Sequence, residues 1–288
     1  NLNADVFYLN QSRRLNWGFG AFRLAGTFYA RLADQLYREQ ASGAYAAVRY
    51  PLSRFTGVEL QTRVEYSDRT DLLGTTVPGA ARRRGMLTSN FLSLVGDNSL
   101  WLDTGPIDGG RYNLTGGVVS DVTHGAFENW TAVVDGRRYL RTTQQSAFAL
   151  RALGYLSDGT RPRPIPIGGG WLLRGYPFFT EIGTRVWVGS AEWRFPITDY
   201  VTLGVPFGAV RFPQVQGAFY NDLAQRWSSG VYDGRVLGSA GIGFRMALIP
   251  GFVFRVDVGK RYSVGGSAAD TGDYYRRRYV SFFYGYNY

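Results

Sequence analysis

Apolar and polar side chains alternate along this chain in runs of about ten residues. The clearest run is residues 55–67, whose first face carries Val58, Leu60, Thr62, Val64 and Tyr66. Its second face carries Glu59, Gln61, Arg63 and Glu65. Successive side chains of a β-strand point to opposite faces. Because the long polar groups need water, the run predicts a strand that separates water from an apolar medium.

The same alternation recurs throughout the chain, in residues 2–9, 15–22, 184–195, 237–248 and 251–259. Repeated alternating segments separated by turns are typical of a transmembrane β-barrel, whose strands face lipid on one side and a polar interior on the other. We count about thirteen strands in this way. The pattern therefore predicts an all-β fold, a transmembrane antiparallel β-barrel that spans residues 1–288 as one domain.

Short connections alternate with long polar ones. We expect tight turns on the periplasmic side at residues 50–54, 196–199 and 249–251. We expect long extracellular loops at residues 32–42, 68–84, 155–183, 224–234 and 262–276. This asymmetry between the two ends of the strands is characteristic of outer-membrane barrels.

The membrane prediction rests on what the chain lacks as well as on its pattern. No stretch approaches about 18 consecutive apolar residues, which excludes a transmembrane helix. A closed barrel is the other structure that satisfies its backbone in lipid. We therefore expect a multi-pass protein of the bacterial cell outer membrane, in contact with outer-membrane lipid and lipopolysaccharide. The alternative is a soluble β-sandwich, but aromatic residues make up 16% of the chain and would leave its outer faces poorly soluble.

The charge of the chain fits a basic barrel interior. Lys and Arg outnumber Asp and Glu by 32 to 22, which gives a formal net charge of +10. The arginines are spread along the chain, and the one dense run, residues 82–84, falls in an expected loop. We therefore expect no nucleic-acid partner, because such binding needs a clustered basic patch.

The chain offers little material for catalysis, and we predict that it is not an enzyme. His124 is the single histidine and falls in an expected turn. Gly168–Gly170 is not a phosphate loop, because no Lys-Ser/Thr pair follows it. Asp257 and Glu192 fall on expected inward positions of strands. With no cysteine and no metal-ligand spacing, we expect no catalytic residues, no cofactor and no metal.

One short motif points to a family. Residues 168–177 read Gly-Gly-Gly-Trp-Leu-Leu-Arg-Gly-Tyr-Pro and lie in the longest expected loop, residues 155–183. Arg174, Gly175 and Tyr176 resemble the Arg-Gly-Phe/Tyr motif of the Omp85 superfamily, the BamA-like or surface antigen D15 barrels of the outer membrane. The resemblance implies that this loop folds back into the lumen of the barrel.

The segments after the motif resemble the last strands of the same family, in the same order. They are Glu192–Ile197, Gly217–Asp222, Gly238–Arg245, Phe254–Gly259 and the terminal strand. The sequence departs from the family pattern at Asn221, where an aromatic residue is usual, and at Ala224, where glycine is common. The specific resemblance covers residues 160–288. Family barrels have sixteen strands, so the resemblance implies either that the first strands lie outside this sequence or that long segments here hide further turns. We also expect no periplasmic POTRA domains, which the family often carries, in this sequence.

The charge on Arg174 gives the motif a physical meaning. A guanidinium in a partly dehydrated lumen needs a carboxylate partner and binds one through two parallel hydrogen bonds. We hypothesise that Arg174 pairs with Asp222, Glu192 or both, that Gly175 lets the loop approach the wall, and that Tyr176 packs against it. The alternative is a solvated extracellular loop whose arginine is incidental.

The chain ends in an aromatic strand. Phe282, Tyr284, Tyr286 and Tyr288 share one face of it. The pattern resembles the C-terminal signal by which outer-membrane barrels are recognised for assembly. The alternative is an aromatic edge strand of a soluble sheet, which would be an aggregation hazard in water.

The family resemblance implies a role in protein translocation or membrane protein assembly, by inserting proteins into the outer membrane or moving them across it. The implied partners are protein substrates and periplasmic or surface partner proteins. Two other functions stay open: a passive porin-like channel whose basic lumen favours anions, and a structural barrel that serves as subunit of a surface complex.

Overall fold

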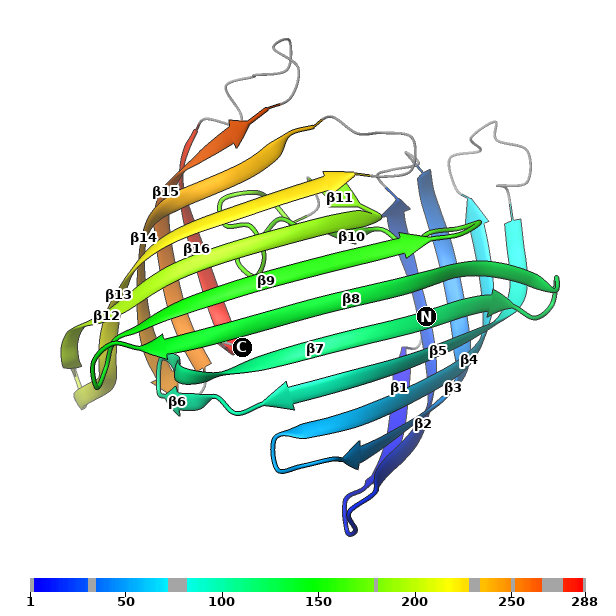
Figure 1. The fold of residues 1–288 in the computed structure, drawn as a ribbon, viewed down its shortest axis with the longest axis horizontal. Helices are drawn as coiled ribbons and strands as arrows, with labels where there is room; N and C mark the ends of the chain where they lie inside the picture. Colours follow the sequence, from blue (N-terminus) through cyan, green and yellow to red (C-terminus); the bar gives the residue numbers. More distant parts are fainter. Residues whose placement is uncertain are drawn as a thin grey trace. The chain divides into compact units, whose positions relative to one another are not determined.

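The computed structural model describes residues 3–30, 35–71, 82–178, 181–227, 234–249, 252–265 and 277–286. All regular secondary structure in these ranges is β-strand (Figure 1). The strands are β1 (Ala4–Asn10), β2 (Asn16–Ala30), β3 (Gln35–Pro51), β4 (Thr56–Asp71), β5 (Arg82–Asp97), β6 (Leu100–Leu102), β7 (Gly105–Asp121), β8 (Ala126–Arg141), β9 (Ala147–Asp158), β10 (Ile165–Pro166), β11 (Ile182–Gly183), β12 (Arg185–Val205), β13 (Gly208–Trp227), β14 (Val236–Ile249), β15 (Phe252–Val264) and β16 (Arg278–Tyr286). None of the described segments forms a helix that could span a membrane.

One large sheet contains almost all of these strands. Its order is β1-β2-β3-β4-β5-β7-β8-β9-β12-β13-β14-β15-β16, with β6 paired to β7 at its side. Neighbours in this order follow one another along the chain, as expected when antiparallel strands are joined by hairpins. The predicted all-β, antiparallel fold class is confirmed. The described order has eight strands before the segment that carries Arg174 and five after it.

The described chain divides into two compact units. The first contains Asn1–Gly96, Asn113–Val133 and Leu156–Arg163. The second contains Asp97–Tyr112, Val134–Tyr155 and Pro164–Tyr288. Each unit is described by itself below.

The two faces of β4, in the first unit, are those that the alternation predicts. Leu60 lies between Val48 of β3 and Leu92 of β5, and these three apolar side chains are exposed on one face. Glu59 and Arg49 lie side by side on the other face, where their charged groups are 3.3 Å apart. A strand with these two faces suits a boundary between an apolar medium and water.

The predicted turn at residues 196–199 is wrong. These residues lie inside β12, which pairs with β13 from Arg185↔Trp227 to Val205↔Gly208. The register shifts between Pro196 and Thr198, so Ile197 is an extra residue in the strand. A bulge accommodates a proline that has no N–H to donate. The chain turns instead just after Val205, and Gly208 has a φ of +145°.

The predicted long loops also extend too far, because strands continue into their ends. Residues 35–42 belong to β3, and β4, β9, β13 and β15 continue to Asp71, Asp158, Trp227 and Val264. These strand ends are polar, as in the ion pair of 3.0 Å between Arg84 and Asp68. Polar hairpin ends lack the apolar face that marks a strand in the sequence. Residues 31–34, 72–81, 228–233, 250–251 and 266–276, which fall in other expected loops and turns, lie outside the described residues.

Candidate functional site

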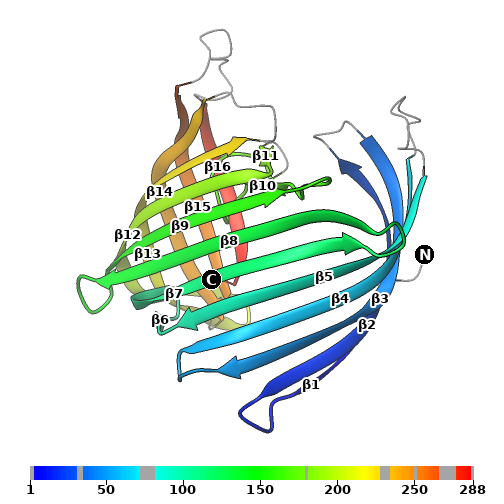
Figure 2. The same ribbon diagram turned by 45° about the vertical axis from the view of Figure 1, so that its right-hand side comes forward.

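The segment between β9 and β12 folds over one face of the second unit, which we call the inward face and define by Glu192, Asp222 and Asp257. Figures 1 and 2 show this segment beside β12 to β16, with β10 and β11 at its base. At its tip, Gly169 N–H donates to the Tyr176 carbonyl at 2.7 Å and closes the loop formed by residues 169–176. Gly168 fits there because a Cβ would lie 2.1 Å from the Pro177 carbonyl oxygen. Gly168 therefore serves close backbone packing, while Gly169 has a φ of +92° that favours glycine.

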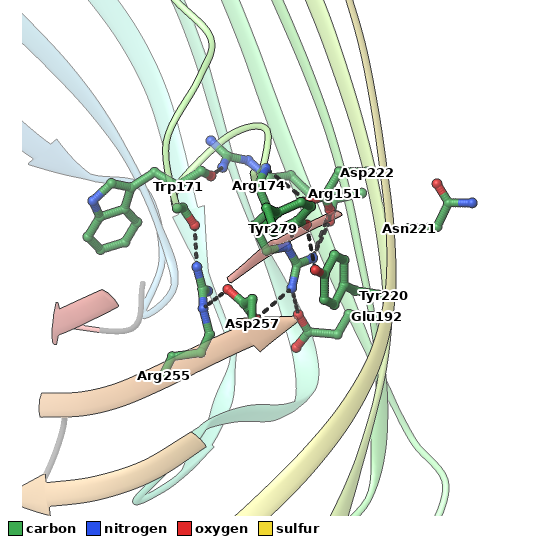
Figure 3. Close-up of polar contacts among 12 residues, drawn as sticks. Arg151, Trp171, Arg174, Glu192, Tyr220, Asn221, Asp222, Arg255, Asp257 and Tyr279 are labelled. Atoms are coloured by element: carbon green, nitrogen blue, oxygen red, sulfur yellow. Dashed lines mark hydrogen bonds and ion pairs between the residues drawn. The ribbon is translucent and has the colours of Figure 1, made fainter. Parts of the chain in front are cut away.

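Arg174 is buried in this tip and faces the strand wall (Figure 3). Its Nε and Nη2 donate to the two carboxylate oxygens of Asp222 at 2.6 and 2.7 Å. Its Nη1 donates to Glu192 Oε2 at 2.7 Å. The Ser190 hydroxyl also donates to Asp222, at 2.6 Å. The structure thus brings together the three charged residues that the sequence grouped, with the two-pronged geometry that arginine and carboxylate favour.

The surroundings of Arg174 fix its charge and its position. Burial lowers the pKa of the guanidinium, but the carboxylates of Asp222 and Glu192 raise it more, so the pKa lies well above its ordinary value. The guanidinium carbon lies 3.7 Å from the centre of the Tyr220 ring, which is a cation–π contact. Removing one partner of such a buried ion pair costs about 3–5 kcal/mol, because the other charge stays buried.

Glu192 joins Arg174 to two further arginines. Its Oε1 accepts from Arg194 Nε at 2.6 Å and from Arg245. Sequence reasoning missed both arginines as part of the site. Arg194 is two residues from Glu192 on the same strand and could have been found, since alternate residues share a face. Arg245 comes from β14 and carries no local signal of the contact.

Gly175 and Tyr176 complete the motif. Gly175 has a φ of +82°, and a Cβ at this position would lie 2.3 Å from the Tyr279 ring of β16. Only glycine adopts this backbone without strain. The buried Tyr176 hydroxyl lies 3.2 Å from the carbonyls of Gly238 and Tyr262. The motif therefore contacts β14, β15 and β16 as well as the strands that hold Arg174.

A second group of contacts, which sequence reasoning missed, precedes the motif. Arg255 Nη2 donates to the Gly170 carbonyl at 2.5 Å, and Arg151 Nη1 donates to the Trp171 carbonyl at 2.8 Å. The Trp171 ring meets Phe283 of β16 edge-on at 4.7 Å between centroids. These contacts join residues far apart in the sequence, so no spacing could have revealed them.

Asn221, the departure from the family pattern, lies on the opposite side of β13 from Asp222 (Figure 3). Its side-chain oxygen accepts from the Tyr262 hydroxyl at 2.6 Å. The amide is paired rather than left bare on an outer face.

The C-terminal aromatic residues are described in part. Phe282 and Tyr284 are 71% and 74% exposed on β16 and pair with Val256 and Phe254 of β15. Tyr286 belongs to the same strand, while Tyr288 lies outside the described residues. The assembly signal therefore stays a prediction.

His124, the candidate for catalysis that the sequence analysis set aside, lies in the turn between β7 and β8. Its Nδ1 lies 2.9 Å from Asp121. The described ranges contain no group of His, Cys, Asp and Glu side chains arranged to hold a metal ion.

Solved structures with the same arrangement of strands identify the fold. The crystal structure of BamA from Haemophilus ducreyi lacking POTRA domains 1–3 matches 98% of this chain with a TM-score of 0.70 and 14% sequence identity. The chain has the BamA barrel fold. CdiB from Acinetobacter baumannii matches 99% of the chain with a TM-score of 0.58 and 12% identity. No protein-family model and no curated protein matches the sequence.

The chain spans 62% of the BamA structure and 50% of the CdiB structure. In this BamA barrel fold, the site is a loop tip held against the inward face by Arg174. It offers a mechanical anchor and a cationic surface. Its two carboxylates nearest Arg174 are both engaged with arginine, which leaves neither poised as an acid or base.

Proposed function

We propose that this chain is the barrel of an Omp85-like protein of the bacterial outer membrane, which inserts proteins into that membrane or translocates them across it. The observation that carries the proposal is the buried Arg174 anchor within a BamA barrel fold. The motif, its carboxylate partners and the strand order come from separate parts of the chain, and all agree with the resemblance read from the sequence.

The outer face of the second unit suits hydrocarbon. Aromatic rings stack along neighbouring strands, with Trp193 of β12 5.9 Å from Phe219 of β13. Phe254 of β15 lies 6.4 Å from Phe282 of β16. Burial of such rings in lipid drives membrane insertion.

The terminal strand β16 would be the element to which a substrate strand binds. β16 pairs with β15 from Phe252↔Tyr286 to Lys260↔Arg278. The backbone groups on its other edge can add a strand from an unfolded substrate by β-augmentation. In this mechanism the loop anchor holds β12 to β16 in place while the β16 edge exchanges partners.

Folding of a substrate barrel in liposomes tests the proposal. A urea-unfolded eight-stranded outer-membrane barrel is added to liposomes that contain the full chain, and its folded form is followed by gel mobility. We expect faster folding than in empty liposomes, with the gain reduced by Arg174→Ala. The matched control is Arg138→Ala, an exposed arginine of β8. Folding no faster than in empty liposomes would contradict the proposal.

A passive anion-favouring pore is the second candidate, because arginines gather on the inward face. Arg137, Arg151, Arg194 and Arg255 all line one cavity there. Planar-bilayer recording separates the two functions. A large, steady, anion-selective conductance without any gain in substrate folding would favour the pore.

A further inference from the structure

The inward face of the second unit contains a cavity of about 80 Å³ beside the loop tip. Strands β8, β9, β12, β13 and β15 form its walls, and loop residues 170–172 form its rim. Its charged lining consists of Arg137, Arg151, Arg174, Arg194, Arg255, Glu192 and Asp222. Cations thus predominate over carboxylates around this cavity.

On the β8–β9 side, two arginines share one carboxylate. Asp135 lies 2.9 Å from Arg137 and 2.7 Å from Arg151, and all three side chains are at most 17% exposed. Both guanidinium groups bind the same acid through two hydrogen bonds each. One positive charge is therefore left without a counter-charge in this group.

On the β12–β15 side, arginines again exceed carboxylates. Glu192 contacts Arg174, Arg194 and Arg245, Asp222 contacts Arg174, and Asp257 lies 2.9 Å from Arg255. Four arginines thus face three carboxylates. Arg245 is 1% exposed, and its Nε and Nη1 have no hydrogen-bond partner among the described residues. Among the residues that line the cavity on this side, Arg174, Arg194 and Arg255 face Glu192 and Asp222, so a second positive charge is left over here.

The guanidinium groups on both sides are held in place. Arg151 donates to the Trp171 carbonyl, and Arg255 donates to the Gly170 carbonyl. Excess cations that are dehydrated and fixed around one cavity favour an anion, because a buried charge is stable only when it is paired. Arginine forks suit the planar or tetrahedral oxygens of carboxylate and phosphate.

From these observations we infer that the cavity is a binding site for a small oxyanion of the phosphate class. Phosphate can accept from several guanidinium groups at once and carries up to two negative charges at neutral pH. It links Arg137 and Arg151 to Arg194 and Arg255, and so holds loop residues 170–172 against the strands. This site goes beyond the proposed function and does not depend on it.

Calorimetric titration of the detergent-solubilised full chain with inorganic phosphate tests the inference. We expect saturable binding that weakens at least tenfold in Arg137→Gln. This variant keeps Asp135 paired to Arg151, so the strand wall stays intact. Cleavage of the loop by protease should slow at least threefold when phosphate replaces chloride at equal ionic strength, and this protection should disappear in the variant.

The matched control is Arg138→Gln, which removes the same charge one residue away on β8, from an exposed side chain. We expect its phosphate affinity to equal that of the unchanged chain. If phosphate affinity weakened equally in both variants, the effect would come from the overall charge of the protein, and the inference of a binding site in the cavity would be overturned. Absence of phosphate binding, or binding of glycerol phosphate alone, would also overturn the inference of a free oxyanion.

Discussion

The ion pair between β3 and β4 of the first unit differs from those that join the loop tip to β12 and β13 in the second unit. Arg49 and Glu59 are 51% and 27% exposed, and their charged atoms are 3.3 Å apart. Arg174 and Glu192 are 5% and 6% exposed, at 2.7 Å. Exposed pairs add at most about 1 kcal/mol, whereas a buried charge that loses its partner costs several kcal/mol. Similar alternating strands therefore carry charges of very different energetic weight.

The covering segment explains the difference. Loop residues 168–176 lie over the inward face of the second unit and remove water from its charges. Every carboxylate there must then find an arginine, as Asp222 and Glu192 do. The comparison teaches that burial by the loop and pairing of the charges occur together on that face, and the predictions below test whether each depends on the other.

The largest expected effect comes from Arg174→Ala, which leaves the buried Asp222 carboxylate without an arginine and removes one of the three arginines that contact Glu192. We expect the free energy of unfolding in detergent to fall by about 3–5 kcal/mol. Urea titration followed by tryptophan fluorescence measures it. A loss no greater than that of Arg49→Ala, whose pair with Glu59 is exposed, would show that the buried pairs resemble the exposed ones.

Gly175→Ala should have the next largest effect. The backbone at this position has a φ of +82°, and the new methyl group would lie 2.3 Å from the Tyr279 ring. Backbone strain and overpacking each cost about 1–3 kcal/mol. We expect faster protease cleavage within residues 159–181, with Gly204→Ala as control because a Cβ there meets nothing within 4 Å. Equal cleavage in both variants would contradict the close approach.

Trp171→Ala tests the contact of the loop with the last strand. The edge-on contact with Phe283 contributes about 0.5–1.5 kcal/mol beyond the buried area. We expect a small loss of stability and faster hydrogen exchange in residues 278–286. If exchange there is unchanged by mass spectrometry, the loop does not support β16.

Arg49→Ala should have the smallest effect. Its pair with Glu59 is exposed, so we expect a loss below about 1 kcal/mol that vanishes at high salt. The same urea titration measures it at two salt concentrations. A loss as large as that of Arg174→Ala would show that the exposed pair of the first unit and the buried pairs of the second unit contribute equally to stability.

Much of this architecture could be predicted from the sequence, because alternation marks each strand that has one apolar face. The grouping of Arg174 with Asp222 and Glu192 also came from the sequence, through the family motif and the need of a buried cation for an anion. The prediction of a turn at residues 196–199 was wrong because proline usually ends a strand, whereas here a bulge accommodates Pro196 within β12. The prediction of a loop at residues 35–42 was wrong because the polar end of a hairpin lacks the apolar face by which the sequence marks a strand.

The contacts around the cavity could not be predicted. Arg255 meets the Gly170 carbonyl, and Arg151 meets the Trp171 carbonyl. Both depend on how the loop lies over the sheet, which neither spacing nor residue type specifies. Alternation places these arginines on the inward face, but their partners are backbone groups, and any residue could supply those.

A double-mutant cycle of Arg174→Ala and Asp222→Ala tests the buried anchor most directly. The free energy of unfolding in detergent is measured for the unchanged chain, both single variants and the double variant. The buried anchor predicts a coupling energy of about 2–3 kcal/mol. Arg174→Ala leaves Asp222 without an arginine, and Asp222→Ala removes the carboxylate that binds Arg174 through two hydrogen bonds, whereas the double change leaves neither group. A coupling energy near zero would mean that Arg174 and Asp222 do not hold the loop to the wall.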